Sequence, residues 1–285
     1  MIRFLVAAVL AVATPLSAQE PPSRVVVAGG DLTEIAFGLG AGDRIVAIDQ
    51  TSTFPEATAT LPQIGYVRRL AAEGILSLEP DLVLAAHDAG PEITFEQLRA
   101  AGVPIAMAPD TPSADSIAEK IRFVGAALGV KEAAHTAAER FLDDLAEVRA
   151  KVAKLPDTPR VLFILGLQGS TPLVGGGGTG ADEMITLAGA QNAATGFKGY
   201  KPMNREAIIG AAPDAILMMA QHSERFGGID AILARPEIAL TPAGKAKRAV
   251  AMDGMLLLGF GPRTPQAIAD LASALQPDAA AAAGF

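Results

Sequence analysis

A segment of this chain occurs twice, and this repetition constrains the fold more than any other feature of the sequence. Residues 70–84 (LAAEGILSLEPDLVL) align without gaps to residues 203–217 (MNREAIIGAAPDAIL). In each copy a glutamate, Glu73 or Glu206, stands seven residues before a Pro-Asp pair, and an apolar run follows. Such a run is typical of a buried strand. The repetition therefore indicates two similar lobes.

Short apolar runs alternate with helical patterns along most of the chain. The runs, which are typical of strands buried in a parallel sheet, occupy residues 24–28, 44–49, 81–86, 103–108 and 160–165. Helical patterns lie between the first four runs, at residues 31–39, 72–78 and 94–101. Residues 131–155 are helix formers ended by Pro156 and predict a long, rigid connecting helix. The expected fold class is α/β, with two Rossmann-like lobes of mostly parallel strands joined by a single long bridging helix.

The first 18 residues (MIRFLVAAVLAVATPLSA) have the pattern of a secretory signal. Arg3 supplies the positive charge, the apolar run is too short to span a bilayer, and small residues precede a cleavage site after Ala18. We expect a soluble, exported protein that resides in the periplasm. The expected domains are a signal peptide over 1–18, an N-terminal lobe over 19–110, a helical segment with the bridging helix over 111–158, a C-terminal lobe over 159–275 and a flexible tail over 276–285.

Composition excludes several kinds of function. The chain has no cysteine, which excludes disulfides, thiolate metal sites and cysteine nucleophiles. Its 31 acidic residues outnumber its 23 basic ones, so no nucleic-acid partner is expected. The phosphate-binding loop, the dinucleotide fingerprint and the G-x-S-x-G elbow are all missing. We therefore expect a binding protein rather than an enzyme, with its ligand in the cleft beyond the carboxyl ends of the strands.

Tyr66 is the residue of greatest chemical interest. It lies in a loop (PQIGYVRRL) and is followed closely by Arg68 and Arg69. A phenol ionises near pH 10, so a phenolate at neutral pH needs a cation such as ferric iron or an arginine. Tyrosine is also one of the residues that hold haem iron. His87 and His222 each follow a predicted strand end and are further candidates for the cleft.

Four segments carry a resemblance to a known family. They are residues 61–84 (LPQIGYVRRLAAEGILSLEPDLVL), 88–91 (DAGP), 97–104 (QLRAAGVP) and 241–265, which begins with TPAG and ends with LGFGPRTP. Together they resemble the periplasmic haem-binding proteins of bacterial haem ABC importers, and the resemblance extends over essentially the whole mature chain. It implies a monomer that carries ferric haem b to the permease of an ABC transporter in the inner membrane, without spanning that membrane itself and without changing the haem.

The resemblance also implies roles for individual residues. Tyr66 matches the axial ligand of ferric haem, and Glu73 and Glu206 match the carboxylates that dock onto the permease. Four arginines become candidates for contact with the haem propionates or the phenolate, namely Arg68, Arg69, Arg225 and Arg263. The expected apolar walls of the cleft are Ile64, Val67, Phe226 and Phe260. Relatives with a second ligand carry histidine after the strand matching residues 160–165, where this chain has none.

Some alternatives stay open at this point. His222 or His87 is a possible second ligand or contact, and Arg225 is the alternative partner of the phenolate. A ferric siderophore or a corrinoid could replace haem as the cargo of the same fold. A secreted haem-handling enzyme is a further alternative from another functional class.

Overall fold

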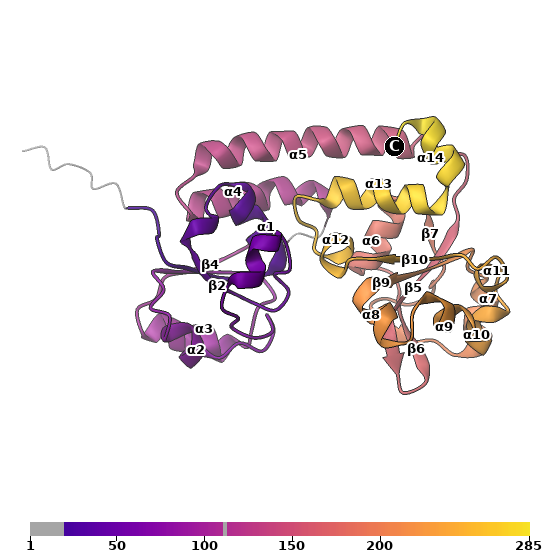
Figure 1. Ribbon diagram of the computed structural model, residues 1–285, viewed down its shortest axis with the longest axis horizontal. Helices are drawn as coiled ribbons and strands as arrows, with labels where there is room; N and C mark the ends of the chain where they lie inside the picture. The colour runs from indigo at the N-terminus through magenta and orange to yellow at the C-terminus, as the bar shows by residue number, and fades with distance from the viewer. Residues whose placement is uncertain (1–19, 111–112) are drawn as a thin grey trace, which may run out of the picture.

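The structure, a computed structural model, describes residues 20–110 and 113–285. Two α/β lobes lie side by side, and the long helix α5 (Lys131–Val152) runs from one to the other (Figure 1). The predicted fold class is confirmed. The predicted signal peptide and the first two residues of the predicted helical segment lie outside the described residues. Among the described helices, none combines the length and the apolar character that crossing a bilayer requires.

The N-terminal lobe contains a parallel sheet with the strand order β2-β1-β3-β4. Every residue of β1 and β3 is buried, which explains why these strands read as unbroken apolar runs. The strands are β1 (Val25–Ala28), β2 (Ile45–Ile48), β3 (Leu82–Ala85) and β4 (Ile105–Met107). The helices are α1 (Gly30–Gly38), α2 (Ala72–Leu76) and α3 (Glu92–Ala100), with short 3₁₀ turns at η1 (Gly42–Arg44) and η2 (Glu56–Thr60).

The C-terminal lobe repeats this arrangement and adds to it. Its parallel strands pair in the order β7-β5-β9-β10. β6 extends the sheet by pairing antiparallel with β5, and β8 pairs antiparallel with β6. The strands are β5 (Arg160–Gln168), β6 (Thr171–Gly175), β7 (Gln191–Asn192), β8 (Tyr200–Pro202), β9 (Ala215–Met219) and β10 (Ala249–Met252). The helices are α6 (Gly180–Leu187), α7 (Arg205–Ala211), α8 (Ala220–Arg225), α9 (Ile229–Leu233), α10 (Pro236–Ala239), α11 (Pro242–Lys245) and α12 (Gly254–Leu258).

A layer of helices covers both lobes on one side. A short 3₁₀ turn, η3 (Ala114–Ser116), leads into α4 (Ile117–Ala127), which lies beneath one half of α5, while α13 (Thr264–Leu275) lies beneath the other half (Figure 1). The 22 residues of α5 span roughly 33 Å at 1.5 Å per residue. One apolar core joins Val27 of the first lobe, Leu145 of α5 and Phe163 of the second. This shared core ties each lobe to the same rigid helix.

The C-terminal tail differs from its prediction. Low complexity predicts a flexible segment over residues 276–285, but Pro277–Ala283 form the helix α14. Proline at the first position of a helix and a run of alanines both favour helix formation. Ala280 is buried and Phe285 packs against the main core, so the tail is anchored to the helical layer.

Candidate functional site

A cavity of about 1040 Å³ lies between the two lobes. Its walls include Gly29 and Gly30 after β1, Asp88 after β3 and Met219 at the end of β9. The cavity therefore lies beyond the carboxyl ends of parallel strands from both sheets, where the sequence predicts the site. Its volume is at the upper end of the range for small-molecule sites, roughly 300–1,000 Å³. It suits one large ligand.

Tyr66 lies in the wall of this cavity, on a loop fixed to the edge strand β2. The Ile64 amide donates to the Ile48 carbonyl at 2.9 Å, and the Gln50 amide donates to the Gly65 carbonyl at 2.8 Å. Gly65 adopts φ 97°, a left-handed conformation that glycine reaches without strain. The turn that follows directs the Tyr66 side chain into the cavity. The loop thus presents a half-buried phenol to the ligand space.

Arg68 connects this phenol to a carboxylate. Its Nη1 donates a hydrogen bond of 2.6 Å to the Tyr66 hydroxyl oxygen, and its Nη2 donates to Oδ2 of Asp88. Partial burial is the largest single influence and works against the charge of Arg68, but Asp88 and Tyr66 together outweigh it and raise the pKa of the guanidinium. Arg68 is therefore a permanent cation whose hydrogen bonds point toward the phenol oxygen and the Asp88 carboxylate. The sequence motifs include Asp88 but assign it no role.

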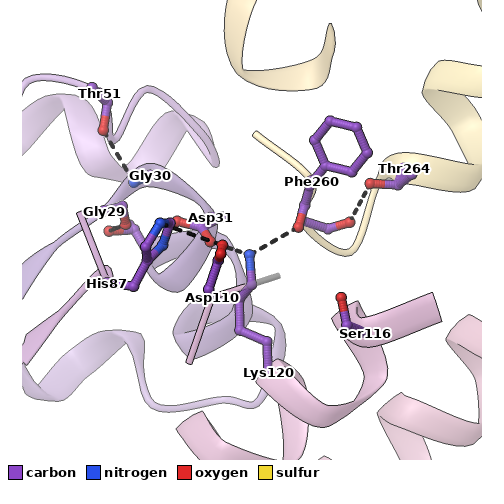
Figure 2. A network of polar contacts seen from close by, with 12 residues as sticks. Gly29, Gly30, Asp31, Thr51, His87, Asp110, Ser116, Lys120, Phe260 and Thr264 are labelled. Atoms are coloured by element: carbon purple, nitrogen blue, oxygen red, sulfur yellow. Dashed lines mark hydrogen bonds and ion pairs between the residues drawn. The ribbon is translucent and has the colours of Figure 1, made fainter. Parts of the chain in front are cut away.

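His87 also lies in the cavity wall, as the sequence predicts. Its Nε2 lies 3.3 Å from Oδ1 of Asp110, in an ion pair whose side chains are both largely exposed (Figure 2). Asp110 lines the same cavity. This pair therefore stands at the open side of the N-terminal wall, beside the tyrosine–arginine pair.

The opposite wall carries a histidine and a second tyrosine. His222, in the first turns of α8, bonds through Nδ1 to the Leu165 carbonyl, which can only accept. Nδ1 is therefore the donor in this hydrogen bond. Tyr200, on the edge strand β8, also lines the cavity. Burial raises the pKa of Tyr200, although Thr179 and Arg68 act in the opposite direction.

A buried lysine in the floor of the cavity binds a carboxylate of the first lobe and a backbone carbonyl of the second. Lys120 of α4 donates to Oδ2 of Asp31 in α1, and to the Phe260 carbonyl of the opposite lobe at 3.1 Å (Figure 2). The Lys120 side chain is only 4% exposed. A Cβ at Gly30 would lie 2.5 Å from the Thr51 carbonyl oxygen, so glycine is needed at this point of the cavity wall. These contacts hold the two walls at a fixed separation.

Arg263 takes part in a second link between the lobes instead of lining the cavity. Its Nε donates to Oε2 of Glu34 at 3.0 Å and its Nη2 donates to Oε1, while the guanidinium carbon stacks 3.7 Å above the Phe54 ring. Glu34 belongs to α1 of the N-terminal lobe. Arg263 is therefore already paired with the mostly buried Glu34 carboxylate. A ligand propionate would have to compete with Glu34 for this guanidinium.

The remaining predicted residues divide into those that line the cavity and those that do not. Val67 and Phe260 line it, whereas Ile64 and Phe226 pack against the cores of their own lobes. Among the described residues, the cavity lining contains neither Arg69 nor Arg225, and both side chains are exposed. Glu73 and Glu206 lie exposed in the first turns of α2 and α7.

Comparison with known proteins identifies the family to which this fold belongs. Residues 25–255 match the periplasmic binding protein family. The chain belongs to that family. The periplasmic haem-binding protein RhuT from Roseiflexus sp. RS-1, solved in its apo form, is similar to this binding protein with a TM-score of 0.86 and 44% identity, over 90% of this chain and 99% of RhuT.

Two further relatives differ in their ligands. The periplasmic haem-binding protein BhuT, solved with two haems, gives a TM-score of 0.85 at 44% identity, over 90% of this binding protein and 98% of BhuT. The vitamin B12-binding protein of Yersinia pestis (strain Pestoides F) is 29% identical over 220 residues, 76% of this chain and 77% of that protein. The resemblance inferred from the sequence motifs is confirmed, and the family is one of binding proteins rather than enzymes.

Proposed function

We propose that this protein captures ferric haem, as haem b, in the cavity between its lobes and delivers it to the permease of an ABC importer. The observation that carries this proposal is the Tyr66 phenol, which lies in the wall of a cavity of about 1040 Å³ and accepts a hydrogen bond of 2.6 Å from Arg68. A phenol binds ferric iron through its anionic form, and the guanidinium places positive charge beside that oxygen.

The rest of the cavity suits a porphyrin. Val67, Leu165, Leu258 and Phe260 supply apolar surface for the faces of the ring. The arginine and the lysine in the described lining already have partners, Arg68 with Asp88 and Lys120 with Asp31, and His87 contacts Asp110. The site therefore binds by coordination and burial, and in our proposal no residue acts on the ligand as a catalyst.

Delivery requires a surface that the permease can recognise. Glu73 and Glu206 are exposed at equivalent places in the two lobes, which supports their proposed role in docking onto basic sites of the permease. The protein would act in the periplasm as a monomer. The lobes are joined through α5, through the ion pair of Arg263 with Glu34 and through the hydrogen bond from Lys120 to the Phe260 carbonyl, so release would come from the permease moving the lobes apart.

The relatives favour haem over the alternatives. Two haem-binding proteins share 44% of their sequence with this chain, against 29% for the vitamin B12-binding protein. A corrinoid or a ferric siderophore remains the second candidate because the family includes a vitamin B12 binder.

A titration of the purified apo-protein tests the proposal. Hemin, cyanocobalamin and a ferric siderophore are added separately, and binding is followed by absorbance and by intrinsic fluorescence quenching. We expect hemin to bind with an absorption band of phenolate-to-iron character, and Tyr66→Ala to lose that band. Tight binding of cyanocobalamin or of the siderophore, without hemin binding, would support the second candidate and refute the first.

A further inference from the structure

Arg68 stands out in the cavity wall because little besides its hydrogen bonds fixes its position. Its side chain is 57% exposed, so surrounding atoms do not fix its rotamer. Its described polar partners are the Tyr66 hydroxyl and the Asp88 carboxylate. A free arginine side chain has high rotamer entropy, which favours a range of positions in solvent. One of the two partners must therefore keep the guanidinium at the phenol.

Asp88 is itself held at a fixed place relative to Tyr66. The loop that carries Asp88 is joined to the tyrosine loop by two backbone hydrogen bonds, from Gly90 to the Val67 carbonyl at 2.9 Å and from Leu70 to the Gly90 carbonyl at 2.8 Å. The Asp88 side chain is 33% exposed, much less than that of Arg68. The Asp88 carboxylate is thus less exposed than the guanidinium that it binds. It accepts a hydrogen bond from Nη2, the nitrogen of Arg68 that does not bind Tyr66.

We propose, on the basis of the proposed function, that Asp88 is a positioning residue for ligand capture. Its carboxylate anchors Nη2 of Arg68, and this keeps Nη1 and the positive charge beside the phenol oxygen that binds iron. A planar guanidinium held at one nitrogen has a defined direction for the other. Asp88 therefore acts through Arg68 and does not touch the ligand iron itself.

Two other roles for Asp88 lead to different expectations. If Asp88 served only to balance charge, removing its charge as Asn or as Ala would have the same effect. If Asp88 competed with a ligand carboxylate for Arg68, its removal would tighten binding. Positioning requires only an acceptor oxygen at this place, so Asp88→Asn keeps most of the function and Asp88→Ala loses it.

The experiment measures the release of hemin from the loaded protein to an excess of apomyoglobin, together with the phenolate-to-iron absorption band. We expect release from Asp88→Ala to be about tenfold faster than from wild type, since a charge-assisted hydrogen bond is lost. Asp88→Asn should stay within about threefold of wild type. The band should shift in Asp88→Ala and match that of Arg68→Ala. The double variant should release hemin no faster than Arg68→Ala alone, because Asp88 acts through Arg68.

A matched control separates positioning from the loss of any aspartate–arginine pair. Asp115→Ala removes an exposed carboxylate that binds Arg149 through two hydrogen bonds, away from the cavity, and should leave release unchanged. Equal effects of Asp88→Ala and Asp88→Asn, slower release from Asp88→Ala, or additive effects in the double variant would each overturn the inference while leaving the proposed function intact. A wild-type protein that does not bind hemin would overturn the proposed function, and this inference with it.

Discussion

The two lobes share a framework but differ in the wall that each presents to the cavity. In the first lobe the Arg24 amide donates to Oδ1 of Asp81 at 2.9 Å, and the Asp81 amide donates back to the Arg24 carbonyl at 3.0 Å. In the second lobe Arg160 and Asp214 repeat both bonds, at 2.9 and 2.7 Å. The repeated Pro-Asp therefore joins two neighbouring parallel strands in each lobe, which is a structural function.

The chemistry lies in loops that are not repeated. In the first lobe Tyr66 and Arg68 lie in the segment between η2 and α2, and Asp88 lies in the short loop after β3. The second lobe extends β5 into a hairpin with β6, adds β8 with Tyr200, and starts α8 directly after β9, which places His222 in the wall. Similar strands thus hold two unlike walls, one with a phenol–guanidinium pair and one with a phenol whose ring lies edge-on to that of Phe163.

The largest effect is expected from the two tyrosines of the chain. Tyr66→Phe should weaken hemin binding by at least about 100-fold, because loss of a metal ligand costs no less than loss of the groups that support it. Tyr200→Phe should keep the phenolate band with a smaller loss of affinity, since burial raises the pKa of Tyr200 and favours its neutral form. Hemin titrations followed by absorbance measure both. A band lost in Tyr200→Phe and kept in Tyr66→Phe would assign the ligand to the other wall.

The second comparison concerns the repeated glutamates. Glu73→Ala and Glu206→Ala should each lower haem uptake by proteoliposomes containing the permease by about tenfold, with hemin binding unchanged, because each removes one charged contact with the transporter. The double variant should be close to inactive. Glu119→Ala, at an exposed position on α4, is the matched control. Uptake that depends on one glutamate only would show that the lobes dock unequally.

The third comparison concerns the repeated aspartates. Asp81 accepts from the Ser23 amide at 2.7 Å and the Ser23 hydroxyl at 2.8 Å in addition to Arg24, whereas the Asp214 carboxylate accepts from Arg160 alone among the described contacts. Asp81→Ala should therefore lower the free energy of unfolding by about 1–2 kcal/mol, and Asp214→Ala by about half as much. Urea denaturation of both variants measures this. Equal losses would mean that the bonds from Ser23 contribute nothing.

Sequence patterns could predict the framework because each strand carries its own signal. β1, β3 and β9 are apolar along their length, and the glutamate and Pro-Asp spacing marks the second copy. Tyr66 and Arg68 could be predicted as well, because the family motif contains them both. The tail was predicted less well, since alanine-rich composition fits both a frayed end and a packed helix.

The remaining site residues depend on contacts between distant parts of the chain. Arg263 meets Glu34 across 229 positions, and nothing in either local sequence indicates a partner in the other lobe. Lys120 and Asp31 are 89 positions apart. Tyr200 lies on a three-residue edge strand with no apolar alternation. Only the packing of the lobes against α4 and α5 brings Arg263 to Glu34 and places Lys120, Asp31 and Tyr200 in the cavity lining.

The smallest effect is expected from the ion pair between the lobes, and it depends on pH. Burial raises the pKa of Glu34 above its usual 4.5, although Arg263 acts in the opposite direction. The folded protein therefore binds this proton more tightly than the unfolded chain does, so the stabilising contribution is complete below pH 4.5 and is lost as the pH rises through the raised pKa. Glu34→Gln keeps an acceptor for Arg263 and cannot ionise.

The stability of wild type relative to Glu34→Gln should therefore decrease between pH 4.5 and neutrality, by less than about 1 kcal/mol. Asp115→Asn is the control with the opposite sign, because the hydrogen bonds from Arg149 lower the pKa of Asp115 and make wild type gain stability over its variant as the pH rises. Urea denaturation at several pH values measures both slopes. If the Glu34 slope had the same sign as that of Asp115, Arg263 would lower the pKa of Glu34 by more than burial raises it. The ion pair between the lobes would then behave like the exposed pair of Asp115 with Arg149.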